Sequence, residues 1–362
     1  MSLPEVQEPP YPLHDSVKHL LDPEYVDFYN QHLIDKQQVH LQPVAASRTS
    51  GVLIPGAGPM LQVGKTHDLL VPRQATQGPA VPIRVFTPPG QAPRQRVACD
   101  VILSWRWLGV GQHQHGERGL LEFMCPRKLR RGHGGLSVRV CLAPTSGDTE
   151  FLTTLSSFLD SLAPEDPFPA AVHDCWEALL WLVQQGPSAI AIDASKMATG
   201  GSSAGGNLAA VMTHKALTLS PPVHFQAQLL SVPVTDNTAT MANNDSYRRY
   251  ERAPALPAAK MIWYRNHYLP EEKDRTNPEA SPLFYDGDWS QLPPALVMVG
   301  ELDVLRQEGE QYAEKLTKAG VSVNLQVMKG MPHPFLAMDG VLKEGKRCIT
   351  LMCDALQDAF WK

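Results

Sequence analysis

Hydrophobic and polar positions follow two different periods along most of this 362-residue chain. Short apolar runs rich in β-branched residues predict strands, which lie at 81–88, 97–103, 196–201, 225–233, 295–303 and 321–330. Apolar residues three and four positions apart predict helices, which lie at 21–36, 172–186, 205–217, 305–320 and 341–361. Strands and helices alternate, so we expect the α/β class, with a mostly parallel sheet and helices on both faces.

Two regions do not follow this alternation. Residues 1–50 contain one predicted helix among prolines, and residues of about 236–275 lack strand signals. We expect both to form a small helical cap over the sheet edge. The remaining chain, 51–362 with the insertion at 236–275, then forms the main domain, and its size and 43% hydrophobic content suffice for a large core.

Composition excludes several classes of function. A net charge of −5 leaves no basic surface for nucleic acid, and no cluster of basic residues suits an anionic membrane. No apolar run is long enough to span a membrane, and the first residues do not resemble a secretory signal. The six cysteines contain no C-x-x-C pair and indicate reduced thiols in a cytoplasmic protein: Cys99, Cys125, Cys141, Cys175, Cys348 and Cys353.

A serine near the middle of the chain has the G-x-S-x-G spacing of a nucleophile. Ser203 lies between Gly201 and Gly205, after a predicted strand and before a predicted helix. The spacing alone also fits a surface turn, because glycine and serine are common. The strand–turn–helix context favours the sharp turn that exposes a nucleophilic hydroxyl.

A serine nucleophile needs a base and an acid that orients the base. Asp303 and His333 each follow a predicted strand, in the chain order that α/β-hydrolases use. Alone, Asp303 could cap the next helix, and His333 could be an ordinary loop residue. Three placements in the right order favour a catalytic Ser203–Asp303–His333 group.

Other candidate groups are weaker. His173 and Asp174 open a predicted helix, where they would act as caps, and His113, His115 and His133 lie in a segment of unusual composition. No group of His, Cys and Asp has the spacing of a metal site, so we expect neither metal nor cofactor.

Five segments between residues 162 and 335 resemble the hormone-sensitive-lipase-like branch of the α/β-hydrolases. They are "LAPEDPFPAAVHD" (162–174), "GGSSAGGNLAA" (200–210), "NPEASPL" (277–283), "PALVMVGELDVLRQEGEQYAEKL" (294–316) and "GMPHPF" (330–335). The resemblance implies the α/β-hydrolase fold and a carboxylesterase in which Ser203 attacks, His333 is general base and acid, and Asp303 orients His333. The family often has an acidic residue before the nucleophile, where this chain has Ser202.

The resemblance also implies an oxyanion hole. Ala204 offers one backbone N–H, and the family takes the others from a His-Gly-Gly-Gly loop after the strand at 97–103. Here the chain instead has "SWRWLGVGQHQHGERGLLEFMCPRKLRRGHGGLSVRVCLAP", with many charges and no strand pattern. We therefore expect the sheet to lack or misplace the strand that follows this loop.

The genetic code offers an explanation for this segment. Reading one base later from Ser104 turns Trp105 and Trp107 into glycine and permits His-Gly-Gly-Gly. Residues 140–161 permit splice-donor, branch-site and acceptor sequences, and their removal restores the original frame. We therefore hypothesise that residues 104–161 reflect a frame slip followed by a retained intron. Two alternatives stay open: "HGG" at 133–135 is a displaced oxyanion loop with donors at Gly134 and Gly135, or the segment is a genuine insertion.

The sequence thus predicts a serine carboxylesterase that acts on a small-to-medium ester. The alternative is a catalytically impaired or ligand-binding α/β-hydrolase, because the His-Gly-Gly-Gly loop is absent as written. The expected partner is a small-molecule ester. Trp263 and Tyr264 of the cap either line its pocket or pack, and a homodimer is one open outcome for the oligomeric state.

Overall fold

The computed structural model describes residues 9–44, 56–58, 65–87, 97–102, 138–141, 163–190, 192–333 and 335–361. Within them, eight strands form one sheet in the order β1-β2-β4-β3-β5-β6-β7-β8. The strands are β1 (Lys65–Val71), β2 (Val81–Thr87), β3 (Val97–Ile102), β4 (Val138–Cys141), β5 (Ile192–Ser202), β6 (Ala227–Ser231), β7 (Ala295–Gly300) and β8 (Val323–Met328). The ladders from β4 to β8 are parallel, and β2 pairs antiparallel with β1 and β4. The predicted α/β class with a mostly parallel sheet is confirmed.

Two strands escaped prediction from the sequence. β1, "KTHDLLV", has Lys65 and Asp68, which are both depleted in strands, among its first four residues, and its partner β2 supplies the ladder. β4, "VRVC", falls inside the segment 104–161, so the expectation that the sheet lacks or misplaces a strand there was wrong. β4 pairs with β2 on one side and β3 on the other, and this two-sided pairing decides its conformation. The rest of 104–161, including His133, Gly134 and Gly135, lies outside the described residues, and the frame-slip hypothesis stays a prediction.

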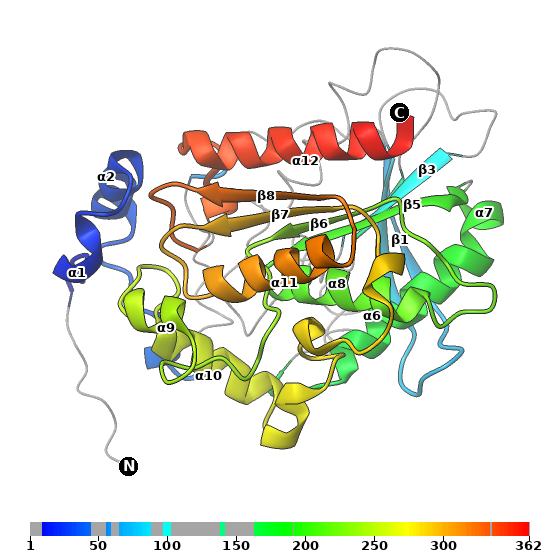
Figure 1. The fold of residues 1–362 in the computed structure, drawn as a ribbon, viewed down its shortest axis with the longest axis horizontal. Helices are drawn as coiled ribbons and strands as arrows, with labels where there is room; N and C mark the ends of the chain where they lie inside the picture. Colours follow the sequence, from blue (N-terminus) through cyan, green and yellow to red (C-terminus); the bar gives the residue numbers. More distant parts are fainter. Residues whose placement is uncertain are drawn as a thin grey trace, which may run out of the picture.

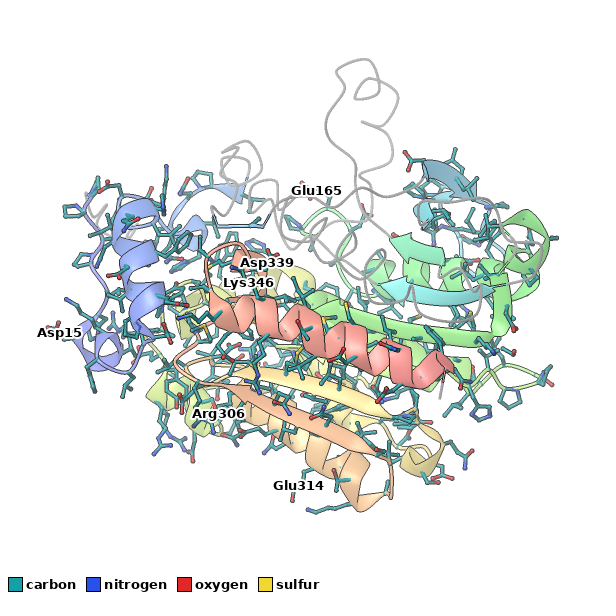
Figure 2. The ribbon with its side chains drawn as sticks, turned by 90° about the horizontal axis from the view of Figure 1, so that it is seen from above. Asp15, Glu165, Arg306, Glu314, Asp339 and Lys346 are labelled. Carbon is teal, nitrogen blue, oxygen red and sulfur yellow. The ribbon has the colours of Figure 1, made fainter. Side chains whose placement is uncertain are left out.

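Helices cover both faces of the sheet (Figure 1). α12 lies on one face, while α6, α8 and α11 lie on the other, and Figure 2 shows α12 running across the sheet. The helices of the main domain are α6 (Ala170–Gln184), α7 (Gly186–Ala189), α8 (Ala204–Ala216), α11 (Arg306–Lys318) and α12 (Lys343–Trp361). The 3₁₀ turns η3 (Pro282–Phe284), η4 (Trp289–Gln291) and η5 (Phe335–Met338) also belong to it, and η2 (Glu272–Thr276) lies where the second cap region ends. Gly186 belongs to a separate short helix and not to α6. It begins α7, because Gln185 continues in helical conformation.

The expected cap regions lie beside the carboxyl ends of β6–β8 (Figure 1). They contain α1 (Asp15–Lys18), α2 (Pro23–His32), η1 (Val39–Leu41), α9 (Asp245–Arg249) and α10 (Ala258–Tyr268). Tyr25 and Phe28 of α2 belong to the same apolar cluster as Tyr247 and Met261 of the second region. The two regions therefore share one core, while the domain boundaries themselves stay predictions. In the described part of the chain, no helix is long and apolar enough to cross a membrane.

Candidate functional site

Ser203 lies in a sharp turn between β5 and α8, in the predicted strand–turn–helix order. Its backbone has φ +57° and ψ −116°, in a left-handed region that a residue with a side chain rarely adopts. Its N–H donates to the Ser231 carbonyl at 2.8 Å, and its carbonyl accepts the N–H groups of Asn207 at 3.0 Å and Val234 at 3.3 Å. Three backbone hydrogen bonds thus hold a strained and half-buried serine.

A glycine next to the expected pair makes this turn compact. The sequence pattern singled out Gly201 and Gly205, but Gly206 has the tightest surroundings that the structure gives for this turn. A Cβ at Gly206 would lie 3.0 Å from Pro233 Cβ and 3.2 Å from the Gly201 carbonyl oxygen. The absence of a side chain at Gly206 therefore lets α8 approach the segment that leaves β6.

Asp303 and His333 form a direct hydrogen bond. His333 Nδ1 lies 2.9 Å from Asp303 Oδ2, and both side chains are buried, with 8% and 1% of their surface exposed. Because a carboxylate oxygen accepts, Nδ1 carries the shared hydrogen, and Nε2 of a neutral ring is then a proton acceptor. Asp303 follows β7 and His333 follows β8, as the sequence predicts.

Asp303 also organises the start of α11, although it does not cap the helix. The N-cap residue is Leu305, and Asp303 Oδ1 accepts the Leu305 N–H at 3.0 Å. Each carboxylate oxygen therefore has its own partner: one fixes the turn, and the other holds the imidazole of His333.

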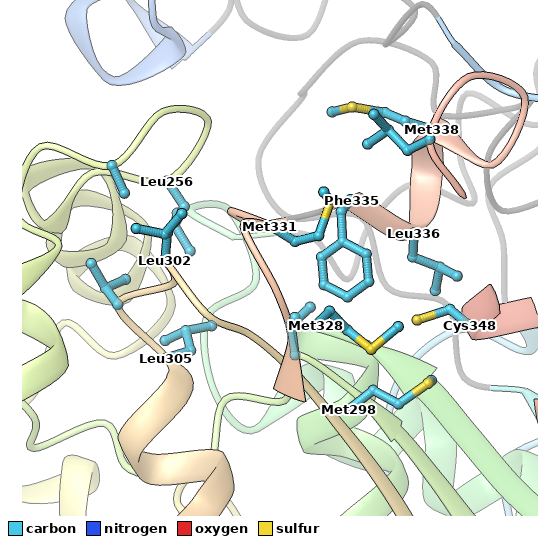
Figure 3. Packing of buried hydrophobic residues seen from close by; sticks show 14 of the residues in the cluster. Leu256, Met298, Leu302, Leu305, Met328, Met331, Phe335, Leu336, Met338 and Cys348 are labelled. Carbon is cyan, nitrogen blue, oxygen red and sulfur yellow. The ribbon is translucent and has the colours of Figure 1, made fainter. Parts of the chain in front are cut away.

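The loop of His333 is anchored by the residue that follows two positions later. Phe335 is fully buried and lies among Met298, Met328 and Met331 (Figure 3). This apolar contact holds the loop after β8 beneath α12. Among the described residues, no hydrogen bond joins the Ser203 hydroxyl to His333, so the turn and the pair are separate units at one edge of the sheet.

Ala204, the predicted oxyanion donor, is buried at the first position of α8. Its N–H therefore lies at the positive end of the helix dipole, which favours an anion there. A small cavity borders Ala204 and is lined also by Leu208, Val234 and Tyr268. The other predicted donors, Gly134 and Gly135, lie outside the described residues.

The cap aromatics singled out from the sequence are packing residues in this structure. Tyr264 is buried in the apolar cluster that joins the two cap regions. Trp263 is partly buried, and its ring meets those of Tyr264 and His267 edge-on. Tyr268, one turn further along α10, is the aromatic residue that borders the cavity at Ala204.

Sequence reasoning missed a buried carboxylate close to this site. Glu308 of α11 is fully buried, and its Oε1 accepts the backbone N–H groups of Thr235 at 2.8 Å and Asp236 at 3.2 Å. Burial raises its pKa well above the usual range, and the nearby Asp236 carboxylate adds to this effect. The signal was present: Glu308 lies three residues after Leu305 and four before Tyr312, on the apolar face of the helix.

The capping role expected for His173 and Asp174 was wrong. Both lie inside α6, which begins at Ala170 and has no side-chain cap. Asp174 is buried and pairs with Arg73, a contact between distant segments that local sequence does not reveal. His113, His115 and His133 lie outside the described residues. The described side chains contain no cluster of three or more potential metal ligands, and the expectation of no metal stays a prediction.

Comparisons with known proteins agree on one family. A family model described as an α/β-hydrolase fold matches residues 160–337. An AB hydrolase superfamily protein of Schizosaccharomyces pombe is 41% identical, with 96% of this chain and 97% of that protein covered. An arylesterase of Saccharolobus solfataricus is 28% identical over 94% of this chain and 99% of its own length.

A solved structure shows the same fold. The hyperthermophilic esterase of the archaeon Pyrobaculum calidifontis superposes with a TM-score of 0.74 at 27% identity, covering 93% of this chain and 98% of that one. The family match and the near full-length relatives lead to one assignment. This chain belongs to the α/β-hydrolase superfamily, in its hormone-sensitive-lipase-like branch.

Proposed function

We propose that this protein is a serine carboxylesterase that cleaves small-to-medium esters through an acyl-enzyme. The observation that carries the proposal is the buried Asp303–His333 hydrogen bond at the edge where the strained Ser203 turn lies. The names of the relatives support ester hydrolysis as the reaction class. A serine held in a left-handed conformation by its surroundings is typical of a nucleophile.

In the proposed mechanism, Ser203 Oγ attacks the ester carbonyl carbon while His333 Nε2 takes the hydroxyl proton. Asp303 keeps the imidazole in the tautomer that accepts at Nε2 and stabilises the imidazolium that forms. The Ala204 N–H donates to the developing oxyanion. His333 then gives its proton to the leaving alcohol, and water, deprotonated by His333, releases the acid from Ser203.

The alternative is a catalytically impaired or ligand-binding α/β-hydrolase. The observation in its favour is that the family match begins only at residue 160, so most of the segment 104–161 lies outside it. Losing one oxyanion donor lowers kcat by about 100- to 1000-fold in known enzymes. We retain the hypothesis that this segment reflects a frame slip and a retained intron; a spliced transcript that encodes it as written would overturn that hypothesis.

The decisive experiment measures hydrolysis of p-nitrophenyl acetate, an aryl ester with a short acyl group. Ser203→Ala should lower kcat by several orders of magnitude, whereas Ser202→Ala, a change at the adjacent serine, should leave it within a few-fold. Equal rates for wild type and Ser203→Ala would refute the esterase proposal for this chain. The cytoplasmic location and the homodimer stay predictions.

A further inference from the structure

Glu308 has no part in the proposed reaction, yet its carboxyl group joins two segments that do. Its Oε1 accepts two backbone N–H groups, from Thr235 and Asp236, and the Thr235 hydroxyl donates to the Glu308 carbonyl at 2.8 Å. Its other oxygen, Oε2, has no hydrogen-bond partner among the described residues. One side chain therefore fixes the backbone at 235–236 to the first turn of α11.

The segment that Glu308 holds is also the one that holds the nucleophile. Residues 231–234 accept from the Ser203 N–H and donate to the Ser203 carbonyl. Pro233 packs against Gly206 on one side and lies near Gly309 of α11 on the other. A shift of this segment would thus move the Ser203 turn.

The helix that carries Glu308 begins just after the acid, Asp303. Asp303 accepts the Arg306 N–H with its carbonyl and the Leu305 N–H with its carboxylate. Glu308 lies one turn beyond these contacts. The two halves of the proposed site, Ser203 after β5 and Asp303 after β7, are therefore joined through Glu308 and the segment after β6.

Among the described residues, Glu308 interacts with charged or titratable groups on several elements. Asp236 and Asp303 both favour its neutral form, while Tyr247 of α9 and Arg265 of α10 lie in the same buried network. Arg265 donates to the carbonyls of Asn237 and Ala239. Oε1 accepts from the two N–H groups in either protonation state of the carboxyl group, so the contact itself depends on geometry.

We propose that Glu308 is a positioning residue, which keeps the Ser203 turn and the Asp303–His333 pair at the spacing that proton transfer requires. The inference rests on the proposed function for the use of that spacing. It needs Glu308 only as a hydrogen-bond acceptor, so glutamine should replace it and alanine should not.

The test compares three variants in the α11 helix. Glu308→Gln should keep kcat within about threefold of wild type, whereas Glu308→Ala should lower kcat by about 100-fold with little change in KM, the scale expected for a small displacement of reacting groups. Glu314→Ala is the matched control, because Glu314 is 60% exposed and lies on the outer side of α11 (Figure 2). If Glu308→Ala does not fold, Glu308→Asp, whose carboxyl group ends one methylene short, should show the same loss of kcat.

A second readout does not depend on turnover. The proton between Asp303 and His333 should give a far-downfield NMR resonance that is retained in Glu308→Gln and lost or shifted in Glu308→Ala. Wild-type protein without Ser203-dependent hydrolysis would refute the esterase proposal, and the resonance would still decide the role of Glu308. An unchanged resonance and kcat in folded Glu308→Ala, or a Glu308→Gln variant as impaired as Glu308→Ala, would overturn the inference.

Discussion

Replacing Asp303 with asparagine tests the proposed site most directly. The side chain is 1% exposed, and its two oxygens have different partners, the Leu305 N–H and His333 Nδ1. An asparagine has the same shape but only one acceptor oxygen. It cannot satisfy both partners with that single oxygen.

The structure leaves two outcomes for the variant: one puts His333 in the wrong tautomer, and the other costs stability at Leu305. If the amide oxygen keeps the Leu305 N–H, the amide NH₂ faces Nδ1 and favours the tautomer with hydrogen on Nε2, which cannot accept the serine proton. If the oxygen faces His333, the amide NH₂ meets the Leu305 N–H, and two buried donors face each other. The unmade hydrogen bond then lowers the free energy of unfolding by about 1–3 kcal/mol. In serine hydrolases the wrong tautomer lowers kcat by about 10⁴-fold, which corresponds to about 5.4 kcal/mol.

The assay is steady-state hydrolysis of p-nitrophenyl acetate near neutral pH. We expect Asp303→Asn to lose kcat with KM nearly unchanged, because Asp303 acts on proton transfer and not on substrate binding. Asp245→Asn is the control, since that side chain is 71% exposed and pairs only on the surface with Arg248. An Asp303→Asn variant that keeps more than about a tenth of wild-type kcat/KM would refute the role assigned to Asp303.

Three further predictions concern stability and packing. Burial lowers the pKa of His214 to about 3, below its ordinary value of 6.5, so the unfolded chain binds the proton first. The free energy of unfolding should therefore fall by up to about 5 kcal/mol as the pH drops from 6.5 to 3. Urea unfolding at several pH values should show a weaker dependence of stability on pH for His214→Gln, but not for His224→Gln at an exposed position. Glu177 accepts three backbone N–H groups of the β1–β2 loop, so Glu177→Ala should lower the free energy of unfolding at pH 7 by about 2–5 kcal/mol, measured by urea titration. Gly206→Ala should cost about 1–3 kcal/mol of stability and reduce kcat, because its Cβ would press on Pro233; thermal unfolding and kinetics check both.

Local patterns were sufficient for the elements around Ser203, Asp303 and His333. β5 and α8 are encoded by runs of a few residues, and the order of serine, acid and base follows directly from the chain. The hydrogen bond between Asp303 and His333 could be expected for the same reason: parallel strands place both residues at one edge of the sheet.

Contacts between distant segments were beyond local reasoning. Asp174 looks like a helix cap until Arg73, about a hundred residues earlier, is placed against it. The place of Glu308 on the apolar face of α11 indicates its burial, but not its partners, the backbone N–H groups of Thr235 and Asp236. β4 has a valine-rich pattern of only four residues, and its conformation depends on β2 and β3 on either side. In each case the deciding partner lies far away in the sequence.

The conformation of Ser203 is itself an argument about function. A left-handed backbone costs a side-chain-bearing residue about 1–3 kcal/mol, and glycine would adopt it without strain. The backbone groups that hydrogen-bond to Ser203 in this conformation belong to Asn207, Ser231 and Val234, three residues outside the segment 104–161. Among the described residues, β5, α8 and the residues after β6 hold the Ser203 turn. Strain at a serine that is held by fixed backbone contacts is the feature expected of the nucleophile that we propose.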